Sequence, residues 1–162
     1  MAERVIDMLL SVDIGNSSVS FGVFTASNVG SVGVEMVHNF QIATRPMTAD
    51  EYAMLICDFL RIKHLTPSST SVFYDSSRDD AGCACVDCAA VASVVPSLTE
   101  TLCQAVSMIS GEKPFVVASG IKTGLGIRIK NPAQLGADIV ANAACAARMF
   151  EAPIIVLDVG TA

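Results

Sequence analysis

The apolar and polar residues of the chain first alternate with the period of β-strands. Residues 8–13 and 19–25 form two such runs, and a short turn containing glycine and asparagine separates them. A third run with a looser alternation covers residues 34–44. Strands joined by short polar connections predict an antiparallel meander that begins with a β-hairpin.

Apolar residues with helical spacing follow the meander. Thr48 and Glu51 have the spacing of a capping box, and the helix predicted after them ends near Lys63. Ser97 and Glu100 repeat this spacing and predict a second helix, which Gly111 closes.

A third helix is predicted from Asn131 as its N-cap. Pro132 stands at the first helical position and Gln134 at the capping-box position. Its expected apolar face consists of Leu135, Ile139, Ala143 and Ala146.

Short apolar runs at residues 88–95, 115–118 and 153–157 predict buried strands between and after these helices. The order of elements up to residue 118 is therefore β-β-β-α-β-α-β. Such an order predicts an α/β fold with a mixed sheet, antiparallel on one side and parallel on the other. Residues 66–87 are polar and lack a period, so we expect an inserted loop there.

The turn of the predicted hairpin carries candidate chemistry. Asp13 ends the first strand, Gly15 permits a close backbone approach, and Asn16 and Ser17 offer hydrogen-bond donors. A carboxylate repels phosphate, but it can hold a divalent cation that binds the phosphate. This stretch therefore fits either a nucleotide-phosphate turn or an ordinary Gly-Asn hairpin.

Composition narrows the classes of partner. Hydrophobic residues make up 52% of the 162 residues, and the net charge is −6 without a cluster of lysine or arginine. We therefore expect one sizeable core, no nucleic-acid partner and no membrane span. Acidic residues interrupt any signal peptide at the N-terminus, so a cytoplasmic location with mostly reduced cysteines is expected.

Three cysteines lie close together in the polar insertion. Cys83, Cys85 and Cys88 could supply thiolates to a metal, although a fourth ligand is missing nearby. Surface thiols on a loop are the alternative, and Cys88 is expected to begin the next strand.

Two further acids stand out near the C-terminal end. Asp138 lies in an otherwise small and apolar helix, where it is either a solvated acid near the helix start or a catalytic base. Asp158-Val159-Gly160-Thr161 repeats the pattern of Asp13-Ile14-Gly15-Asn16, again after an apolar run. Two acid-glycine turns favour a phosphate clamp in a duplicated fold.

With these motifs in this order, the sequence resembles type III pantothenate kinases, of the superfamily of sugar kinases, actin and heat-shock chaperone ATPases. The residues that carry the resemblance are Asp13-Ile14-Gly15-Asn16, Ser93-Val94-Val95-Pro96, Gly120-Ile121-Lys122-Thr123-Gly124-Leu125, Asn131-Pro132, Gly136-Ala137-Asp138 and Asp158-Val159-Gly160-Thr161-Ala162.

The resemblance implies a ribonuclease H-like, actin-like ATPase fold in which two related domains close over ATP. Residues 1–118 are then the first domain, with the insertion at about 66–87. Residues 119–162 form a linker helix and the first strand of a truncated second domain. The implied reaction phosphorylates pantothenate with ATP to 4'-phosphopantothenate, the first step of coenzyme A synthesis. The full-length family is expected to form homodimers.

Site roles also follow from the resemblance alone. Asp138 is the implied proton acceptor, and Asp158 the implied ligand of a monovalent cation, potassium or ammonium. Pantothenate is assigned to Gly136, Ala137, Asp138 and Ile139. ATP, with Mg²⁺, is assigned to Asp13, Ile14, Gly15, Asn16, Ser17, Ser18, Val19, Ser20 and Thr161.

Two positions depart from the family pattern. Ile139 stands where the family commonly has arginine, so a charged contact to the pantothenate carboxylate is either missing or supplied elsewhere. Ile129 stands where the family often has an aromatic residue, so one wall of the substrate pocket changes. A full-length member also continues well past Ala162. We therefore expect this chain to be the N-terminal part of a kinase with poor activity alone; the alternative is a non-catalytic binding or regulatory module.

Overall fold

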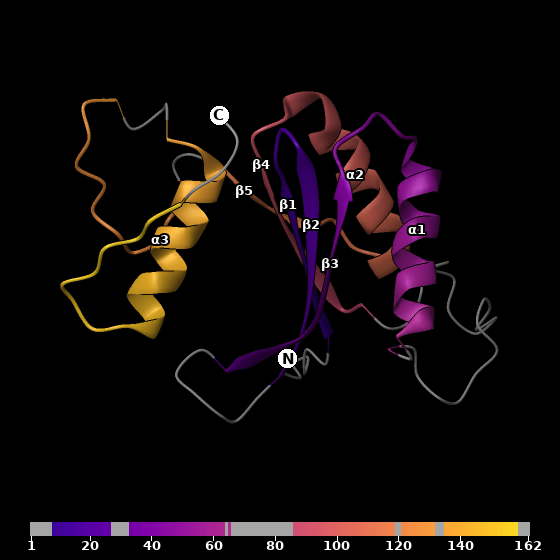
Figure 1. Ribbon diagram of the computed structural model, residues 1–162, viewed down its shortest axis with the longest axis horizontal. Helices are drawn as coiled ribbons and strands as arrows, with labels where there is room; N and C mark the ends of the chain where they lie inside the picture. Colours follow the sequence, from indigo (N-terminus) through magenta and orange to yellow (C-terminus); the bar gives the residue numbers. More distant parts are fainter. Residues whose placement is uncertain are drawn as a thin grey trace.

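The structure is a computed structural model that describes residues 8–26, 33–63, 65, 86–118, 121–131 and 135–158. Five strands form one sheet, and three helices pack around it (Figure 1). In chain order the elements are β1 (Met8–Ile14), β2 (Ser18–Ala26), β3 (Val34–Ala43), α1 (Ala49–Ile62), β4 (Cys88–Ser93), α2 (Pro96–Ser110), β5 (Phe115–Val117) and α3 (Ala137–Met149).

The sheet is mixed, with the strand order β3-β2-β1-β4-β5. β1 pairs antiparallel with β2, and β2 with β3, which confirms the predicted meander. β4 joins β1 in parallel, and β5 joins β4 in parallel. β1 is therefore the central strand, and it leads directly into the turn that contains the first acid-glycine motif.

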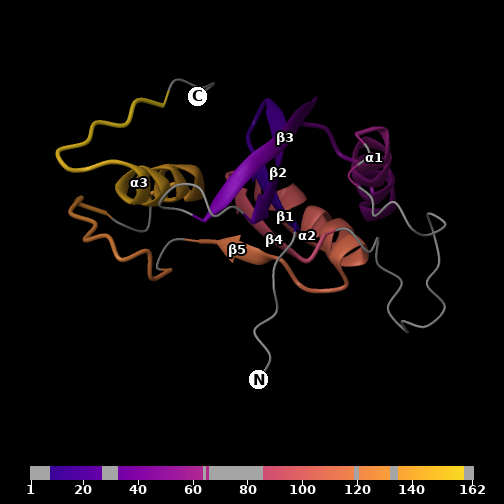
Figure 2. The same cartoon turned by 90° about the horizontal axis from the view of Figure 1, so that it is seen from below.

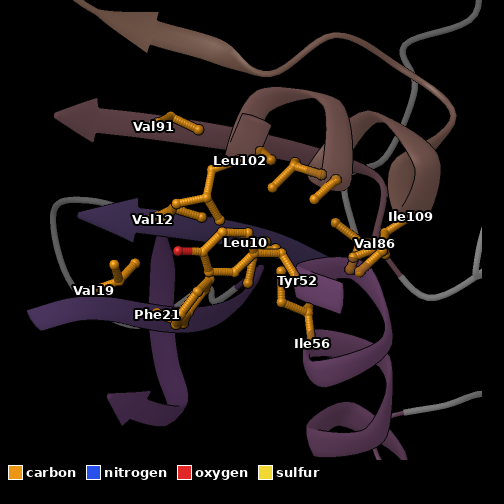
Figure 3. Packing of buried hydrophobic residues seen from close by; sticks show 14 of the residues in the cluster. Leu10, Val12, Val19, Phe21, Tyr52, Ile56, Val86, Val91, Leu102 and Ile109 are labelled. Atoms are coloured by element: carbon orange, nitrogen blue, oxygen red, sulfur yellow. The ribbon is translucent and has the colours of Figure 1, made fainter. Parts of the chain in front are cut away.

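The helices cover both faces of the sheet. Figures 1 and 2 show α1 and α2 on one side and α3 on the other. α1 packs against α2, while α3 contacts β4 and β5. Alternate residues of β1 and β2 point towards α1 and α2, where Leu10, Val12 and Phe21 lie buried around Tyr52 (Figure 3). The opposite face of β1 carries Leu9, Ser11 and Asp13, so the acid near the end of β1 points away from this core.

The first helix begins as predicted. The side chain of Thr48 accepts a hydrogen bond from the Glu51 amide, and the Glu51 carboxylate accepts one from the Thr48 amide. The hydrogen bond that the backbone N–H of Thr48 donates is the largest cause that lowers the pKa of Glu51.

The second helix begins differently from the prediction. Val95 is its N-cap, Pro96 lies in its first turn, and no side chain caps it, so the expected box of Ser97 and Glu100 is wrong. The Thr99 hydroxyl donates instead to Ser93 Oγ at 2.7 Å. Gly111 ends the helix with a φ of 73°, as predicted.

The third helix begins later than predicted, because its N-cap lies five residues after Asn131, the predicted N-cap. Its N-cap is Gly136, which has an extended backbone, and residues 132–134 lie outside the described part of the chain. Only Ala137 and Val140 of this helix are buried, and Ile139 is exposed. The apolar pattern predicted too long a helix because Leu135 belongs to the segment before it.

Two other predictions about strands are corrected. β5 is an edge strand with Phe115 59% exposed, so it is not a buried strand. Residues 153–157 form no strand, because no described segment pairs with them, and Ile155 and Leu157 are 87% and 85% exposed. Cys88 does begin β4, whereas Cys83, Cys85 and most of the 66–87 insertion lie outside the described residues. None of the helices in the described ranges is long and apolar enough to cross a membrane.

Candidate active site

The turn between β1 and β2 is closed by one internal hydrogen bond and held by Thr44, which directly follows β3. The Gly15 amide donates to the Ser18 carbonyl at 2.9 Å, which closes the turn. Thr44, just after β3, donates from its amide to the Ser17 carbonyl at 3.0 Å and from its hydroxyl to the Gly15 carbonyl at 2.7 Å. A Cβ on residue 15 would lie 3.0 Å from the Ser18 carbonyl, so the turn is tight at Gly15. Thr44 was not among the residues predicted from the sequence to belong to the site.

A row of polar side chains crosses the sheet beside this turn. Register places Asp13 opposite Ser20, and Ser20 opposite Gln41. Gln41 donates to Ser18 Oγ at 2.8 Å and to Ser20 Oγ at 3.2 Å. The alternation of the three predicted strands contained this signal, since each member stands between apolar positions that are buried or partly buried.

Two of the proposed ATP-lining residues point the other way. Ile14 and Val19 are fully buried in the core between the sheet and the helices α1 and α2. Only their backbone groups are therefore available to a ligand at the turn. Asn16 and Ser17 are exposed at the tip of the turn.

The N-terminus of α3 supplies the second part of the site. Asp138 lies in the first helical turn, and its Oδ1 accepts a hydrogen bond from the Ile139 amide at 2.8 Å. A Cβ on Gly136 would collide with this same carboxylate oxygen. Glycine at position 136 is therefore what leaves room for the observed position of the Asp138 side chain.

An open pocket lies next to Gly136 and Ala137. Side chains at the ends of β4 and β5 and at the start of α2 form its other walls, among them the hydroxyl residues Ser93 and Thr99. The apolar lining comes from Val94, Pro96, Val116, Val117, Ala118 and Leu135.

Asp158 reaches the site from the segment after α3. Its Oδ2 accepts a hydrogen bond from Asn142 Nδ2 at 3.1 Å. Asn142 lies one helical turn after Asp138, so the two residues share one face of α3. This spacing was visible in the sequence, although Asn142 was not predicted as a site residue.

Electrostatic interactions connect the three carboxylates. The pKa of Asp13 is raised, first by desolvation, then by the negative charge of Asp138, and then by that of Asp158. None of the causes of the raised Asp13 pKa is a positively charged side chain among the described residues. The carboxylates of Asp13 and Asp158, one from each acid-glycine motif, are therefore within electrostatic reach of each other, and residues 159–162 of the second motif lie outside the described residues.

The donor atoms of this region suit a hard cation. Carboxylate, hydroxyl and amide oxygens are the ligands that Mg²⁺ and other hard cations prefer. Within the described ranges, however, no three histidine, cysteine, aspartate or glutamate residues are arranged as a ready metal site. Thr161, the implied ATP contact, lies outside these ranges.

Comparison with known proteins identifies the family of the chain. A family model described as type III pantothenate kinase matches residues 9–162. The chain belongs to the type III pantothenate kinase family. The match includes both acid-glycine motifs and Asp138, so the family resemblance seen in the sequence is confirmed.

Curated type III pantothenate kinases show the same relationship. The chain is 35% identical to the protein of Bifidobacterium animalis subsp. lactis and 31% identical to that of Moorella thermoacetica, over 96% of this chain in both cases. It is 36% identical to the protein of Shouchella clausii over the same share. The chain spans about half the length of these relatives, which is 53%, 52% and 52% respectively.

A search of solved structures gave a much weaker likeness. Thermus thermophilus RuvC matches with a TM-score of 0.39 and 13% identity, over 86% of this chain and 95% of RuvC. A likeness of this size supports no conclusion about function.

Proposed function

We propose that the chain is part of a pantothenate kinase that transfers the γ-phosphoryl group of ATP to a hydroxyl of pantothenate. The observation that supports the proposal is that the negative charges of Asp138 and Asp158 both act on Asp13 and, after desolvation, raise its pKa. Family membership supports the reaction, and this interaction supports a site near the three acids.

The turn after β1 is the proposed phosphate site. Backbone amides at a tight turn can donate to phosphate oxygens, and hydroxyls such as Ser17 and Ser18 can add further bonds. Asp13 would hold Mg²⁺, which neutralises phosphate charge and orients the phosphates when bound. Its pKa is raised by desolvation and then by the negative charges of Asp138 and Asp158, and a bound cation would stabilise such a carboxylate.

Asp138 is the proposed proton acceptor. Its carboxylate takes the proton of the pantothenate hydroxyl as the new oxygen–phosphorus bond forms. The bond between the γ-phosphorus and the β,γ-bridging oxygen breaks, and ADP leaves with the electron pair. The pocket bordered by Gly136 and Ala137 is the proposed place for pantothenate. Ile139 and Ile129 stand at the sequence positions where the family commonly has arginine and often has an aromatic residue.

Asp158 is the proposed ligand of the monovalent cation, potassium or ammonium. A hard cation beside this carboxylate would offset the negative charge that three acids and a triphosphate bring together. The division into a domain at 1–118 and the start of a second at 119–162 remains a prediction, as do homodimer formation and cytoplasmic location.

A product assay tests the proposal. The full-length protein that contains this chain should convert ATP and pantothenate into equal amounts of ADP and 4'-phosphopantothenate, measured by mass spectrometry. The 162-residue chain alone should give little or no product, because it spans about half of its relatives. ADP release without phosphopantothenate from the full-length protein would refute the assignment.

A binding or regulatory module is the second candidate. It is favoured by the half-length match and by the exposed apolar residues Ile155 and Leu157, which offer a surface for a partner. Under this proposal the chain binds pantothenate or nucleotide in calorimetry, and no phosphorylated product forms even with the full-length protein.

A further inference from the structure

Two hydroxyl groups form part of the wall of the pocket next to Gly136. Ser93 ends β4, Thr99 lies near the start of α2, and both residues line the pocket. Of the described residues that line it, only these two have polar side chains. The hydrogen bonds of this pair therefore determine which polar group of a ligand the wall can bind.

Each hydroxyl has one proton to donate, and both protons are used within the segment itself. Thr99 Oγ1 lies 2.7 Å from Ser93 Oγ and 3.1 Å from the Val95 carbonyl oxygen. Ser93 Oγ lies 3.2 Å from the same carbonyl oxygen and accepts a hydrogen bond from the Val95 amide at 3.1 Å. Either Thr99 donates to Ser93 and Ser93 to the carbonyl, or Ser93 donates to Thr99 and Thr99 to the carbonyl. In both arrangements, a ligand would have to break one of these bonds to receive a proton.

Thr99 keeps the capacity to accept in both arrangements. A hydroxyl oxygen can accept two hydrogen bonds, and within the segment Thr99 Oγ1 accepts at most the one from Ser93. Ser93 Oγ already accepts from the Val95 amide, and a bond from Thr99 fills it. The wall therefore suits an N–H or O–H group of a ligand. A carboxylate or carbonyl oxygen would meet acceptors there and would lose its bonds to water without replacement.

The segment that carries this pair is tied to both parts of the candidate site. Ser93 pairs with Ile14 in the register of β4 and β1, and the Val94 amide donates to the Ile14 carbonyl at 3.0 Å. A Cβ on Gly136 would lie 3.7 Å from Val94 Cγ1, so the segment also packs against the N-cap of α3. Figure 1 shows that α2 and α3 begin near the same end of β4. A ligand at this wall is therefore close to the turn after β1 and to the helix that carries Asp138.

We propose that Thr99 is a specificity residue whose Oγ1 accepts a hydrogen bond from a donor of pantothenate other than the hydroxyl that is phosphorylated. The inference rests on the proposed function for the identity of the ligand. Two groups of pantothenate qualify, the secondary hydroxyl and the amide N–H. Its carboxylate does not, so it points away from this wall. The proposal also gives a role to the motif Ser93-Val94-Val95-Pro96, to which the reaction itself assigns none.

Calorimetry of the full-length protein with pantothenate and two analogues tests the inference. One analogue carries a methyl group on the amide nitrogen, and the other has hydrogen in place of the secondary hydroxyl. Wild type should bind at least one of them about tenfold more weakly than pantothenate, as expected for one lost hydrogen bond. In Thr99→Val this difference should fall below about twofold, because valine keeps the shape of the side chain but has no acceptor. Thr99→Ser should restore it.

Two control variants separate ligand recognition from a structural role of the hydroxyls. In Ser107→Ala, α2 loses a hydroxyl that bonds to the Cys103 carbonyl and lies outside the pocket, so all three affinities should stay unchanged. Ser93→Ala removes a hydroxyl from the pocket wall but leaves Thr99 the Val95 carbonyl as its acceptor. The preference for pantothenate over the analogue should therefore persist in Ser93→Ala, even where binding of every compound weakens. If Thr99→Val does not fold, Thr99→Cys replaces it, because a thiol is a weak acceptor.

Three results would overturn the role of Thr99 while pantothenate still binds. Both analogues could bind to wild type within twofold of pantothenate. The weaker binding of an analogue could be equal in wild type and Thr99→Val. Ser93→Ala could lose the preference as fully as Thr99→Val, which would assign the effect to the fold of the wall. A full-length protein that does not bind pantothenate at all refutes the proposed function, and this inference with it.

Discussion

The carboxylates of Asp13 and Asp158, from opposite ends of the chain, lie close enough to interact. Desolvation and the charge of Asp138 are the larger causes that raise the pKa of Asp13, and Asp158 adds to them. Repulsion of this kind is unfavourable for folding alone. It is expected where a bound cation or metal-nucleotide later supplies the missing positive charge.

Replacement of Asp13 should therefore separate stability from activity. Asn at position 13 removes a charge that the fold accommodates poorly, so Asp13→Asn should raise the melting temperature at neutral pH. The raised pKa means that the folded state binds this proton more tightly than the unfolded state, whose value is near 3.8. The stability difference should thus disappear as the pH falls below that value.

The measurement is a series of thermal melts from pH 3 to pH 8 for the wild type and Asp13→Asn. Kinase activity of the full-length variant should be lost over the range where its melting temperature is higher. A variant that is less stable than the wild type at pH 7 would contradict the electrostatic explanation.

Loss of the proposed proton acceptor should act on the chemical step. Asp138→Asn keeps the shape of the side chain but cannot accept the hydroxyl proton, so kcat should fall about 10²- to 10⁴-fold. The KM for ATP should change little, because the turn after β1 is untouched. Steady-state kinetics of the full-length protein measure both, and a kcat within a factor of two of wild type would exclude the role.

A methyl group added at position 136 should displace the Asp138 carboxylate. In Gly136→Ala the new Cβ meets Asp138 Oδ1, which is the end of a side chain and can move at small cost to stability. Displacement of a reacting group by about 1 Å can cost roughly 100-fold in rate. We expect a fall of this order in kcat/KM with little change in melting temperature.

Gly126→Ala is the control for this experiment, because no heavy atom lies within 4 Å of a Cβ built there. It should retain both activity and stability. Equal losses in the two variants would show that the effect at position 136 is not specific to Asp138.

A fourth prediction concerns Thr44, whose hydrogen bonds hold the turn after β1 in place. Thr44→Val removes the hydroxyl donor to the Gly15 carbonyl but keeps the backbone bond to Ser17. We expect a loss of about 1 kcal/mol in the free energy of unfolding. The KM for ATP should rise more than the KM for pantothenate, and Thr44→Ser should recover most of both. Chemical denaturation and kinetics test the two effects, and an unchanged KM for ATP would argue against a phosphate site at the turn.

The sequence predicted those parts of the fold whose signal is local. Alternation gave the meander, and the reciprocal bonds of Thr48 and Glu51 gave the start of α1. It failed where tertiary contacts choose between similar local signals. Pro96 and Val95 begin α2 in place of the box at Ser97, and Gly136 in place of Asn131 is the N-cap of α3.

The candidate site could also be predicted only in part from the sequence. The acids Asp13, Asp138 and Asp158 stood out by motif, and the family match includes all three. Thr44 and Asn142 act through long-range hydrogen bonds, which no local pattern of a single sequence encodes. The apolar run at residues 153–157 looked like a strand, but strand formation needs a neighbour to pair with, and no described segment provides one.

In the proposed enzyme, acids from both ends of the chain face one metal-nucleotide site. Paramagnetic relaxation from Mn²⁺·ATP bound to the full-length protein would detect this arrangement. We expect strong broadening of the amide signals of Gly15, Asp138 and Asp158 together, while Glu51 on α1 remains sharp. Broadening at Gly15 without broadening at Asp138 and Asp158 would contradict it.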